Sequence, residues 1–203
     1  MRTGLPQHIG FIPDGNRRWA CDHGLPKESG YGFGVEPGVR LFEYCRDSGV
    51  REISVYGFTR DNTKRPARQK VLFAQACVDF AQAVAARGAA LLVVGDEDSP
   101  VFPRELRVYR KRQGDGMKVN LLVNYGWDWD IEGLRHGALR SAAVSRLDLI
   151  VRWGGGRRLS GFLPIQSVYA DFFILDEYWP DFALPQFERA LQWFRAQDRT
   201  LGG

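Results

Sequence analysis

An α/β fold, with a central, mostly parallel sheet flanked by helices, is what this sequence predicts. Short runs rich in branched and aromatic residues recur along the chain, and stretches with apolar residues at three- and four-residue spacing separate them. Strands that alternate with helices in this way form parallel sheets, because each helix returns the chain across the sheet. With 203 residues, 44% of them hydrophobic, the chain is long enough for one domain, residues 1–203, with a substantial core.

The expected strands, in chain order, are runs of residues that fit a buried pleated sheet: Ile9–Ile12, Glu52–Phe58, Ala90–Val94, Lys118–Asn124 and Leu147–Arg152. The expected helices are stretches whose apolar residues recur on one helical face: about Gly34–Ser48, Arg68–Arg87, Arg104–Lys111, Ile131–Ser141 and Leu184–Arg199. The sequence contains no repeat, low-complexity segment or linker that would interrupt this alternation.

The charge pattern and the cysteines argue against several kinds of protein. The formal net charge is only +4 with both signs interspersed, so we expect anionic ligands but no nucleic-acid partner. Met1–His8 lacks the apolar core of a signal peptide, and no apolar run approaches the length of a membrane span. The three cysteines are far apart and lack zinc-ligand spacing. We therefore expect a cytoplasmic protein without stable membrane insertion, whose thiols are reduced.

Polar loops follow three of the expected strands. They are Asp14–Arg18 after the first strand, Thr59–Pro66 after the second and Arg152–Ser160 after the fifth. Ligands of open parallel sheets bind beyond the carboxyl ends of the strands. Each loop alone fits a solvent-facing turn, but three loops with Arg, Asn and Gly at one edge favour a diphosphate site over coincidence.

The first loop has the chemistry that a metal-bound diphosphate requires. Asp14 can offer a hard oxygen to Mg²⁺, and Gly15 allows the backbone to come close to a ligand. Asn16 offers an amide, and Arg18 offers a planar fork of donors that matches phosphate oxygens. Taken alone, Asp-Gly-Asn is more often an ordinary turn.

Five segments, in this order, resemble the motifs of one enzyme family: His8–Ala20, Tyr56–Pro66, Asn124–Trp127, Asp148–Leu163 and Tyr178–Phe182. The first reads His-Ile-Gly-Phe-Ile-Pro-Asp-Gly-Asn-Arg-Arg-Trp-Ala, close to the family's His-x-x-x-x-Met-Asp-Gly-Asn-x-Arg-Trp-Ala. The family is that of the cis-prenyltransferases, the Z-type isoprenyl diphosphate synthases that include undecaprenyl diphosphate synthase. The resemblance covers nearly the whole chain and implies that family's fold, a Mg²⁺ cofactor, isoprenyl diphosphate substrates and a homodimer.

The resemblance also implies roles for individual residues. The metal ligands would be Asp14 and Asp171, the latter standing where the family usually has Glu. The catalytic residues would be Asp14, Asn16, Arg18 and Asn62. The substrate-binding residues would be Gly15, Arg17, Trp19, Lys27, Tyr31, Thr59, Arg65, Arg152, Arg158 and Ser160, of which the last three would hold the acceptor's diphosphate. The closing Leu201–Gly203 resembles a chain end that can reach the neighbouring subunit's site.

The hydrocarbon tails of such substrates need an apolar cleft between helix and sheet. Phe73, Cys77, Phe80 and Leu91 are candidates for its lining, although ordinary core packing explains any one of them better.

Several positions depart from the family pattern around both diphosphates, and the stretch between Trp127 and Asp148 is short. The departures include Pro13, Lys27, Tyr31, Thr63, Gln69, Trp153 and Gly156. We interpret Trp153 as added bulk in the acceptor loop and Gly156 as a lost carboxylate. This pattern is similar to the short, irregular branch of the family, the lavandulyl, cyclolavandulyl and isosesquilavandulyl diphosphate synthases. It predicts head-to-middle coupling of dimethylallyl diphosphate with dimethylallyl or geranyl diphosphate.

Three alternatives remain. The first is a regular head-to-tail synthase that makes a short cis product from isopentenyl diphosphate, which the retained arginines suit equally well. The second is a non-catalytic partner subunit, against which the retained Asp14, Asn16, Arg18 and Arg65 argue. The third, a nucleic-acid-binding module, is the least favoured and predicts salt-dependent binding of polyanions.

Overall fold

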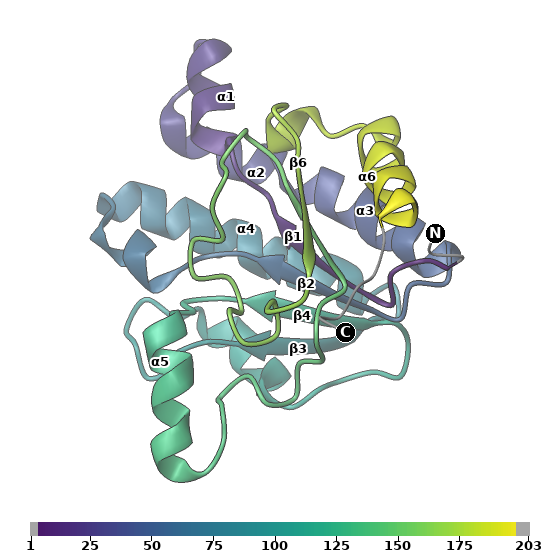
Figure 1. Cartoon of the computed structure of the whole chain (residues 1–203). Helices are drawn as coiled ribbons and strands as arrows, with labels where there is room; N and C mark the ends of the chain where they lie inside the picture. Colours follow the sequence, from purple (N-terminus) through teal and green to yellow (C-terminus); the bar gives the residue numbers. More distant parts are fainter. Residues whose placement is uncertain (1–3, 198–203) are drawn as a thin grey trace.

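The computed structural model describes residues 4–197, and a six-stranded sheet lies at its centre. Every pair of neighbouring strands in the sheet runs parallel, in the order β3-β4-β2-β1-β5-β6 (Figure 1). The strands are β1 (His8–Ile12), β2 (Glu52–Tyr56), β3 (Ala90–Val94), β4 (Lys118–Leu122), β5 (Leu149–Arg152) and β6 (Asp171–Ile174). The expected parallel α/β architecture is confirmed, although β2 and β4 each end two residues earlier than predicted.

The α-helices are α1 (Asn16–Asp22), α2 (Gly30–Phe33), α3 (Val35–Asp47), α4 (Ala67–Ala85), α5 (Trp127–Glu132) and α6 (Leu184–Ala196). One face of the sheet packs against α3, α4 and α6 in the larger core, which contains Ile9, Phe11, Ile53, Val119, Phe42, Phe80 and Phe187. The other face is covered by irregular segments that contribute Val144, Leu147, Phe162 and Leu163. The sheet therefore has a helical layer on one face and a thinner, mostly non-helical cover on the other.

Two predicted helices are wrong in kind or extent. Arg104–Lys111 is a 3₁₀ helix, η3 (Arg104–Arg110), rather than an α-helix. The expected helix Ile131–Ser141 is replaced by α5, the 3₁₀ helix η4 (Gly133–His136) and turns. Gly137 accounts for the second difference, since its left-handed backbone (φ 99°) ends the helical segment. The short elements α1, α2 and β6 were not predicted.

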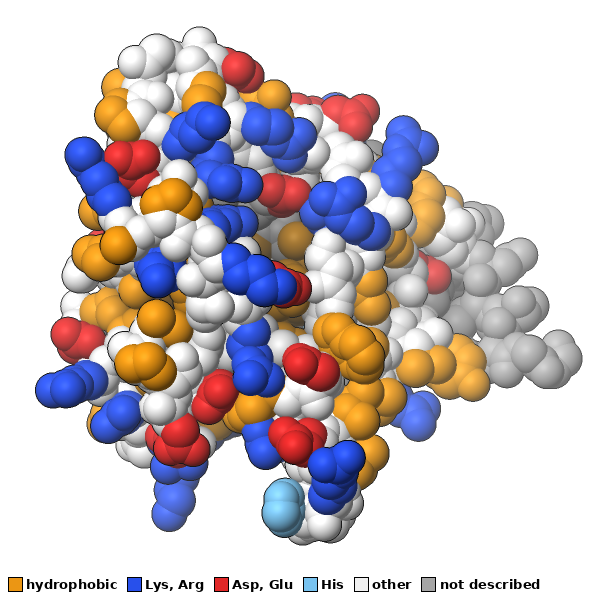
Figure 2. Space-filling model, turned by 90° about the vertical axis from the view of Figure 1, so that its left-hand side faces the viewer, with side chains coloured by type: hydrophobic (Ala, Val, Ile, Leu, Met, Phe, Trp, Pro, Cys, Tyr) orange, Lys and Arg blue, Asp and Glu red, His pale blue; other side chains and the backbone are white. Residues whose placement is uncertain are grey.

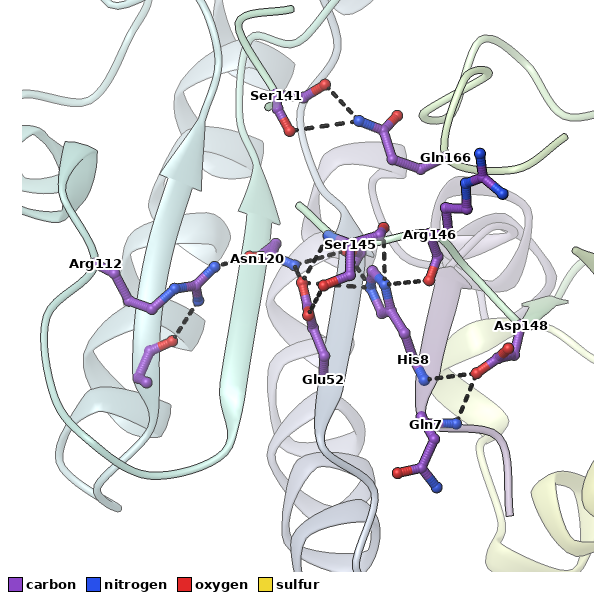
Figure 3. A network of polar contacts seen from close by, with 12 residues as sticks. Gln7, His8, Glu52, Arg112, Asn120, Ser141, Ser145, Arg146, Asp148 and Gln166 are labelled. Carbon is purple, nitrogen blue, oxygen red and sulfur yellow. Dashed lines mark hydrogen bonds and ion pairs between the residues drawn. The ribbon is translucent and has the colours of Figure 1, made fainter. Parts of the chain in front are cut away.

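A buried network of polar side chains crosses β1, β2 and β4 on the thinly covered face (Figure 3). The Nε2 atom of His8 lies 2.8 Å from Ser54 Oγ, and Asn120 Nδ2 donates to both Ser54 Oγ and a Glu52 carboxylate oxygen. The Ser145 hydroxyl donates to the other Glu52 oxygen. Because buried polar groups are costly without partners, this network compensates for polar residues in the interior of a parallel sheet.

The network predicts that acid destabilises the fold. Burial lowers the pKa of His8 below its ordinary value of 6.5. Burial would raise the pKa of Glu52, but His8, Ser145 and Asn120 outweigh it and hold that pKa below 4.5. Both groups therefore bind protons more tightly in the unfolded chain, so the free energy of unfolding falls as pH drops below 6.5 and again below 4.5.

Urea unfolding of wild type at about pH 7.5 and about pH 5.5 measures this loss of stability. Changing His8 to Asn removes the titrating ring, so we expect a smaller loss between the two pH values. The matched control is His136→Asn at an exposed position, which is expected to behave as wild type does. An equal loss of stability in His8→Asn and wild type would contradict the assignment to His8.

None of the helices within residues 4–197 combines the length and the apolar character that a bilayer crossing requires.

Candidate active site

A cleft of about 810 Å³ opens at the carboxyl ends of β1, β2 and β5. The three polar loops that follow these strands all contribute to its lining, at Asp14–Arg18, at Thr59–Arg65 and at Arg152–Ser160. Figure 2 shows Lys and Arg side chains gathered around a hollow in the face at the left of Figure 1. The cleft thus lies where parallel sheets bind ligands, and its rim is cationic.

Asp14 lines the cleft because β1 ends two residues before it. Its backbone carbonyl accepts a hydrogen bond from the Trp179 N–H at 3.0 Å, which fixes the loop. The carboxylate accepts from the Gly15 N–H at 2.6 Å and from Arg152 Nη2 at 2.8 Å, while Arg18 Nη2 lies 3.8 Å away. Since the side chain is still 39% exposed, the carboxylate is open to a ligand from the cleft.

Gly15 cannot be replaced without strain, because its φ of 99° lies in the left-handed region and a Cβ would stand 2.6 Å from the Tyr178 ring. The same Tyr178 ring lies under the Arg18 guanidinium, 5.0 Å from ring centroid to Cζ. Tyr178 therefore supports both the tight turn and one of the cations of the site.

Arg152 is the most buried cation of the site, with 4% of its side chain exposed. It donates to Ser160 Oγ at 2.9 Å and to the Arg158 carbonyl, while its Nε is buried without a partner. Ser160 itself has a φ of 55°, an uncommon conformation for a residue other than glycine. A Cβ on Gly156 would lie 2.5 Å from Arg152 Nη2, so only glycine leaves room for this guanidinium.

The opposite wall carries a second set of cations around Arg65. Arg65 Nη1 donates to the Tyr31 hydroxyl at 2.6 Å, and the Tyr31 ring stacks on Phe73 with centroids 4.4 Å apart. Burial raises the pKa of Tyr31 and lowers the pKa of Arg65. Arg17 and Lys27 line the cleft as well.

Thr59 and Asn62 form a reciprocal capping box at the start of the 3₁₀ helix η2 (Arg60–Lys64). This fixes the loop after β2, and both residues line the cleft. Asn16 donates from Nδ2 to the Pro13 carbonyl at 2.8 Å, and its Oδ1 is buried without a partner. Asn16 lines the cleft as well, so this amide oxygen is an acceptor that the fold leaves unused.

Loss of the Tyr31 hydroxyl is expected to weaken the binding of anions beside Arg65. Tyr31→Phe keeps the stack on Phe73 but removes the acceptor that orients the Arg65 guanidinium, so the Kd of inorganic diphosphate should rise about threefold to tenfold. Isothermal titration calorimetry measures this Kd. Tyr44→Phe, at a tyrosine outside the cleft whose hydroxyl donates to Glu188, serves as the control. Equal Kd values for Tyr31→Phe and wild type would contradict this positioning role.

Most predicted site residues line the cleft: Asp14, Gly15, Asn16, Arg17, Arg18, Lys27, Tyr31, Thr59, Asn62, Arg65, Arg152, Arg158 and Ser160. Two others do not. Trp19 donates from Nε1 to Asp181 at 2.6 Å and stacks on His23 and Phe33. Asp171 begins β6 and pairs with Leu149, so it lies at the amino end of the strands, away from Asp14. The predicted role of Leu201–Gly203 falls outside the described residues.

The interpretation of Trp153 as added bulk in the acceptor loop is wrong. Its ring is fully buried in the larger core between Phe11, Trp179 and Phe182, and its Nε1 donates to Gln186. Trp153 therefore does not shape the cleft.

Sequence reasoning missed two tyrosines of the cleft. Tyr56 and Tyr178 line the cleft, although in the sequence each is only the first residue of a family motif. Tyr56 donates to the Ser160 carbonyl at 2.9 Å and thereby joins the second and third loops. Its position at the end of β2, directly before a polar loop, was a usable signal.

The donor set around Asp14 fits a magnesium ion that shares its coordination with a substrate. Among residues 4–197, no cluster of three or more His, Cys, Asp or Glu side chains could hold a metal by itself. Mg²⁺ commonly binds through one or two carboxylates, with phosphate oxygens and water as its other ligands. Asp14 has this character, because its partly exposed carboxylate lies beside Arg152 and Arg18 in a cationic cleft.

The parallel sheet and its cationic cleft define a class of α/β proteins that bind phosphorylated ligands at the carboxyl edge. Residues 12–202 match the sequence model described as "Putative undecaprenyl diphosphate synthase". The chain is also 33% identical over 218 residues to the tritrans,polycis-undecaprenyl-diphosphate synthase (geranylgeranyl-diphosphate specific) of Aeropyrum pernix, with 98% of this chain and 99% of that protein covered. The chain therefore belongs to the undecaprenyl diphosphate synthase family, the cis-prenyltransferases.

Two further comparisons agree with this family. The ditrans,polycis-undecaprenyl-diphosphate synthase ((2E,6E)-farnesyl-diphosphate specific) of Yersinia pseudotuberculosis is 30% identical over 228 residues, covering 98% of this chain and 90% of that protein. The crystal structure of lavandulyl diphosphate synthase from Lavandula x intermedia, in complex with dimethylallyl diphosphate, superposes with a TM-score of 0.84 at 21% identity. That alignment covers 98% of this chain and 99% of the other, and it shows the shared fold.

Proposed function

We propose that this chain is a Mg²⁺-dependent enzyme that joins dimethylallyl diphosphate head-to-middle to dimethylallyl or geranyl diphosphate, giving a lavandulyl-type diphosphate. The observation that carries the proposal is the placement of cations on two sides of Asp14. Arg65 follows β2, and Arg152 and Arg158 follow β5; all three line the cleft. Asp14 follows β1, the strand between those two, so its carboxylate lies between two groups of cations. Two groups of cations with a carboxylate between them suit two diphosphates and one shared metal.

In this proposal the donor's diphosphate binds Arg65, which the Tyr31 hydroxyl orients. The acceptor's diphosphate binds Arg158 and Ser160, with Arg152 beside them. Mg²⁺ held by Asp14 would supply a Lewis acid that draws charge off the leaving diphosphate. The protein mainly aligns the substrates and stabilises charge, since the reaction needs no covalent intermediate.

The chemical step breaks the allylic C–O bond of the donor, and the electron pair leaves with the diphosphate. The internal double-bond carbon of the acceptor then bonds to the allylic carbon and leaves a tertiary cation. Loss of a proton to the released diphosphate, or to a hydroxyl of Tyr31, Thr59 or Ser160, completes the reaction. All three hydroxyl-bearing residues line the cleft.

The head-to-middle assignment rests on the departures that lie at the cleft. Tyr31 contacts Arg65 directly, and Gly156 gives Arg152 the space to reach Asp14. Gln69 Oε1 accepts a hydrogen bond at 3.5 Å from Nη1 of Arg17, a residue that lines the cleft. Trp153 does not contribute to this assignment, because its ring is in the core. The dimethylallyl diphosphate bound in the lavandulyl diphosphate synthase structure adds support, since the two folds correspond over nearly their full lengths.

Mass spectrometry of the products tests the coupling. The pure protein is incubated with Mg²⁺ and dimethylallyl or geranyl diphosphate, each with and without isopentenyl diphosphate. A branched product without isopentenyl diphosphate supports the proposal. A product that forms only in its presence would favour a regular head-to-tail synthase, for which the same arginines are equally suitable.

We extend the proposal to a homodimer. A hollow of about 730 Å³ at the amino end of β5 is lined mainly by apolar residues: Leu139, Ala142, Val144, Leu147, Ile165 and Val168. Ile165 and Val168 are 47% and 63% exposed, and β6 beside them is an edge strand of the sheet. Apolar surface of this kind suits a second copy. Turnover by the purified chain alone would exclude a merely supportive, non-catalytic role.

A further inference from the structure

Tyr178 lines the cleft, while the next residue in the chain lines a different space. Trp179 is a wall of a small apolar pocket of about 60 Å³ that adjoins the cleft, and Tyr178 is not. The residues expected to line such an apolar space are divided between it and the larger core. The pocket contains Phe73, Cys77 and Phe80, and the core contains Leu91. At residues 178–179 the chain thus passes from the cationic cleft to its apolar neighbour, and the side chain of Tyr178 stays with the cations.

The backbone on both sides of Tyr178 is held by the loops that follow β1 and β5. The Glu177 carbonyl accepts a hydrogen bond from the Gly154 N–H at 2.8 Å, and the Trp179 N–H donates to the Asp14 carbonyl at 3.0 Å. Trp179 is itself anchored in the larger core, with only 4% of the residue exposed. Tyr178 is therefore fixed where these two loops meet.

The Tyr178 ring contacts both Gly15 and Arg18. A Cβ built on Gly15 would stand 2.6 Å from Cδ1 and 3.1 Å from Cγ of the ring, so only a glycine lets the first loop pass this close. The Arg18 guanidinium carbon lies 5.0 Å from the ring centroid, within the range of a cation–π interaction. Both contacts are made by the aromatic ring, and a phenylalanine at this position would keep them.

Arg18 needs support of this kind because its side chain is long and 53% exposed. Its Nη2 donates to the Gly154 carbonyl at 2.8 Å and lies 3.8 Å from Asp14 Oδ1. A half-exposed arginine otherwise samples many rotamers, and ordering it when a ligand binds costs conformational entropy. With the ring under the guanidinium and a carbonyl at its tip, this cost is smaller because the guanidinium is already placed beside Asp14.

We propose that Tyr178 is a positioning residue whose ring holds the Arg18 guanidinium in place for a diphosphate group. This inference rests on the proposed function of the cleft, because it requires a diphosphate beside Asp14. It does not depend on the chain that the diphosphate carries or on which carbon of the acceptor reacts. Tyr178 acts through Arg18, so its effect on the ligand requires the arginine.

The test measures the Kd of inorganic diphosphate in the presence of Mg²⁺ by isothermal titration calorimetry. Tyr178→Leu removes the ring, so this Kd should rise about threefold to tenfold. Tyr178→Phe keeps the ring, so its Kd should remain within about twofold of the wild-type value. Tyr178→Met gives a second variant without the ring if the leucine variant does not fold, and circular dichroism reports the fold of each.

The matched control is a second arginine that lies over an aromatic ring, outside the cleft. The guanidinium carbon of Arg140 lies 4.7 Å from the Trp129 ring centroid, and neither residue lines the cleft. Trp129→Leu therefore removes a ring from beneath an arginine without touching the diphosphate site, and it should leave the Kd of diphosphate unchanged.

A double-mutant cycle tests whether Tyr178 acts through Arg18. Arg18→Ala alone should weaken the binding of diphosphate, and adding Tyr178→Leu to it should change the Kd by less than about twofold. General damage to the cleft would instead raise the Kd by the same factor in both backgrounds. Equal factors would therefore overturn the positioning role.

The other outcomes separate this inference from the proposed function. An unchanged Kd in Tyr178→Leu would overturn the role of Tyr178 and leave the diphosphate site standing. A Kd for Tyr178→Phe as high as that for Tyr178→Leu would also overturn it, because the hydroxyl and not the ring would then be the required group. A failure of wild type to bind diphosphate with Mg²⁺ would overturn both this role and the proposed function.

Discussion

Removal of the Asp14 carboxylate is expected to lower turnover by about 1,000-fold or more while the fold persists. Asp14→Ala deletes the carboxylate that lies beside Arg152 and Arg18 in the cleft. Without it, the cations for the diphosphates remain, but the hard oxygen beside them that would share a metal is lost. Product formation at saturating substrate and Mg²⁺ measures the effect, and circular dichroism reports the fold.

Two variants sharpen this result. Asp14→Asn keeps an oxygen for the Arg152 guanidinium but loses the charge, so it separates metal binding from support of Arg152. We expect it to be nearly as inactive as Asp14→Ala. Asp22→Ala removes another carboxylate that lines the same cleft and should keep most of the activity. Comparable activity in Asp14→Asn and wild type would refute the metal-ligand role.

Truncation of Trp153 is expected to cause the largest loss of stability. Its fully buried ring contacts three aromatic side chains, and its Nε1 donates to Gln186 Oε1 at 3.0 Å. Trp153→Ala should therefore lower the free energy of unfolding by about 3–5 kcal/mol. Urea unfolding measures the change, and Trp153→Phe, a smaller truncation, keeps the measurement possible if the alanine variant does not fold.

Trp127 is the matched control for Trp153, because 54% of its side chain is exposed. Trp127→Ala should change stability by no more than about 0.5 kcal/mol. We also expect Trp153→Phe to leave the ratio of branched to linear products unchanged, since the ring does not line the cleft. A changed product ratio would restore Trp153 to the acceptor site.

The strands that consist of apolar runs were predictable from the sequence, whereas the short strand β6 was not. The first five strands are mostly apolar runs, and the loops after β1, β2 and β5 meet at one edge as parallel pairing requires. β6 has only four residues and contains Asp171, so it lacks a comparable signal. Because that strand was missed, its register was unknown, and Asp171 could not be placed relative to Asp14.

Trp153 illustrates a signal that was present but not used. Along β5, Leu149 and Val151 point to the core under the helices, while Ile150 belongs to the smaller core on the other face. Continued alternation places Trp153 on the same side as Leu149 and Val151, where the structure has it. The family motif suggested that Trp153 belongs to the acceptor loop, whereas the alternation along β5 predicts that its side chain enters the larger core.

The contact between Asp14 and Arg152 joins positions 138 residues apart, and Trp179 meets Gly34 across 145 residues. Contacts of such sequence separation form late, because the chain must close long loops before they contribute. During synthesis, β1 leaves the ribosome long before β5 exists, so the nascent chain holds Asp14 without its arginine partner. The cleft is therefore completed only when nearly the whole chain has folded, and no amino-terminal fragment that lacks β5 can form it.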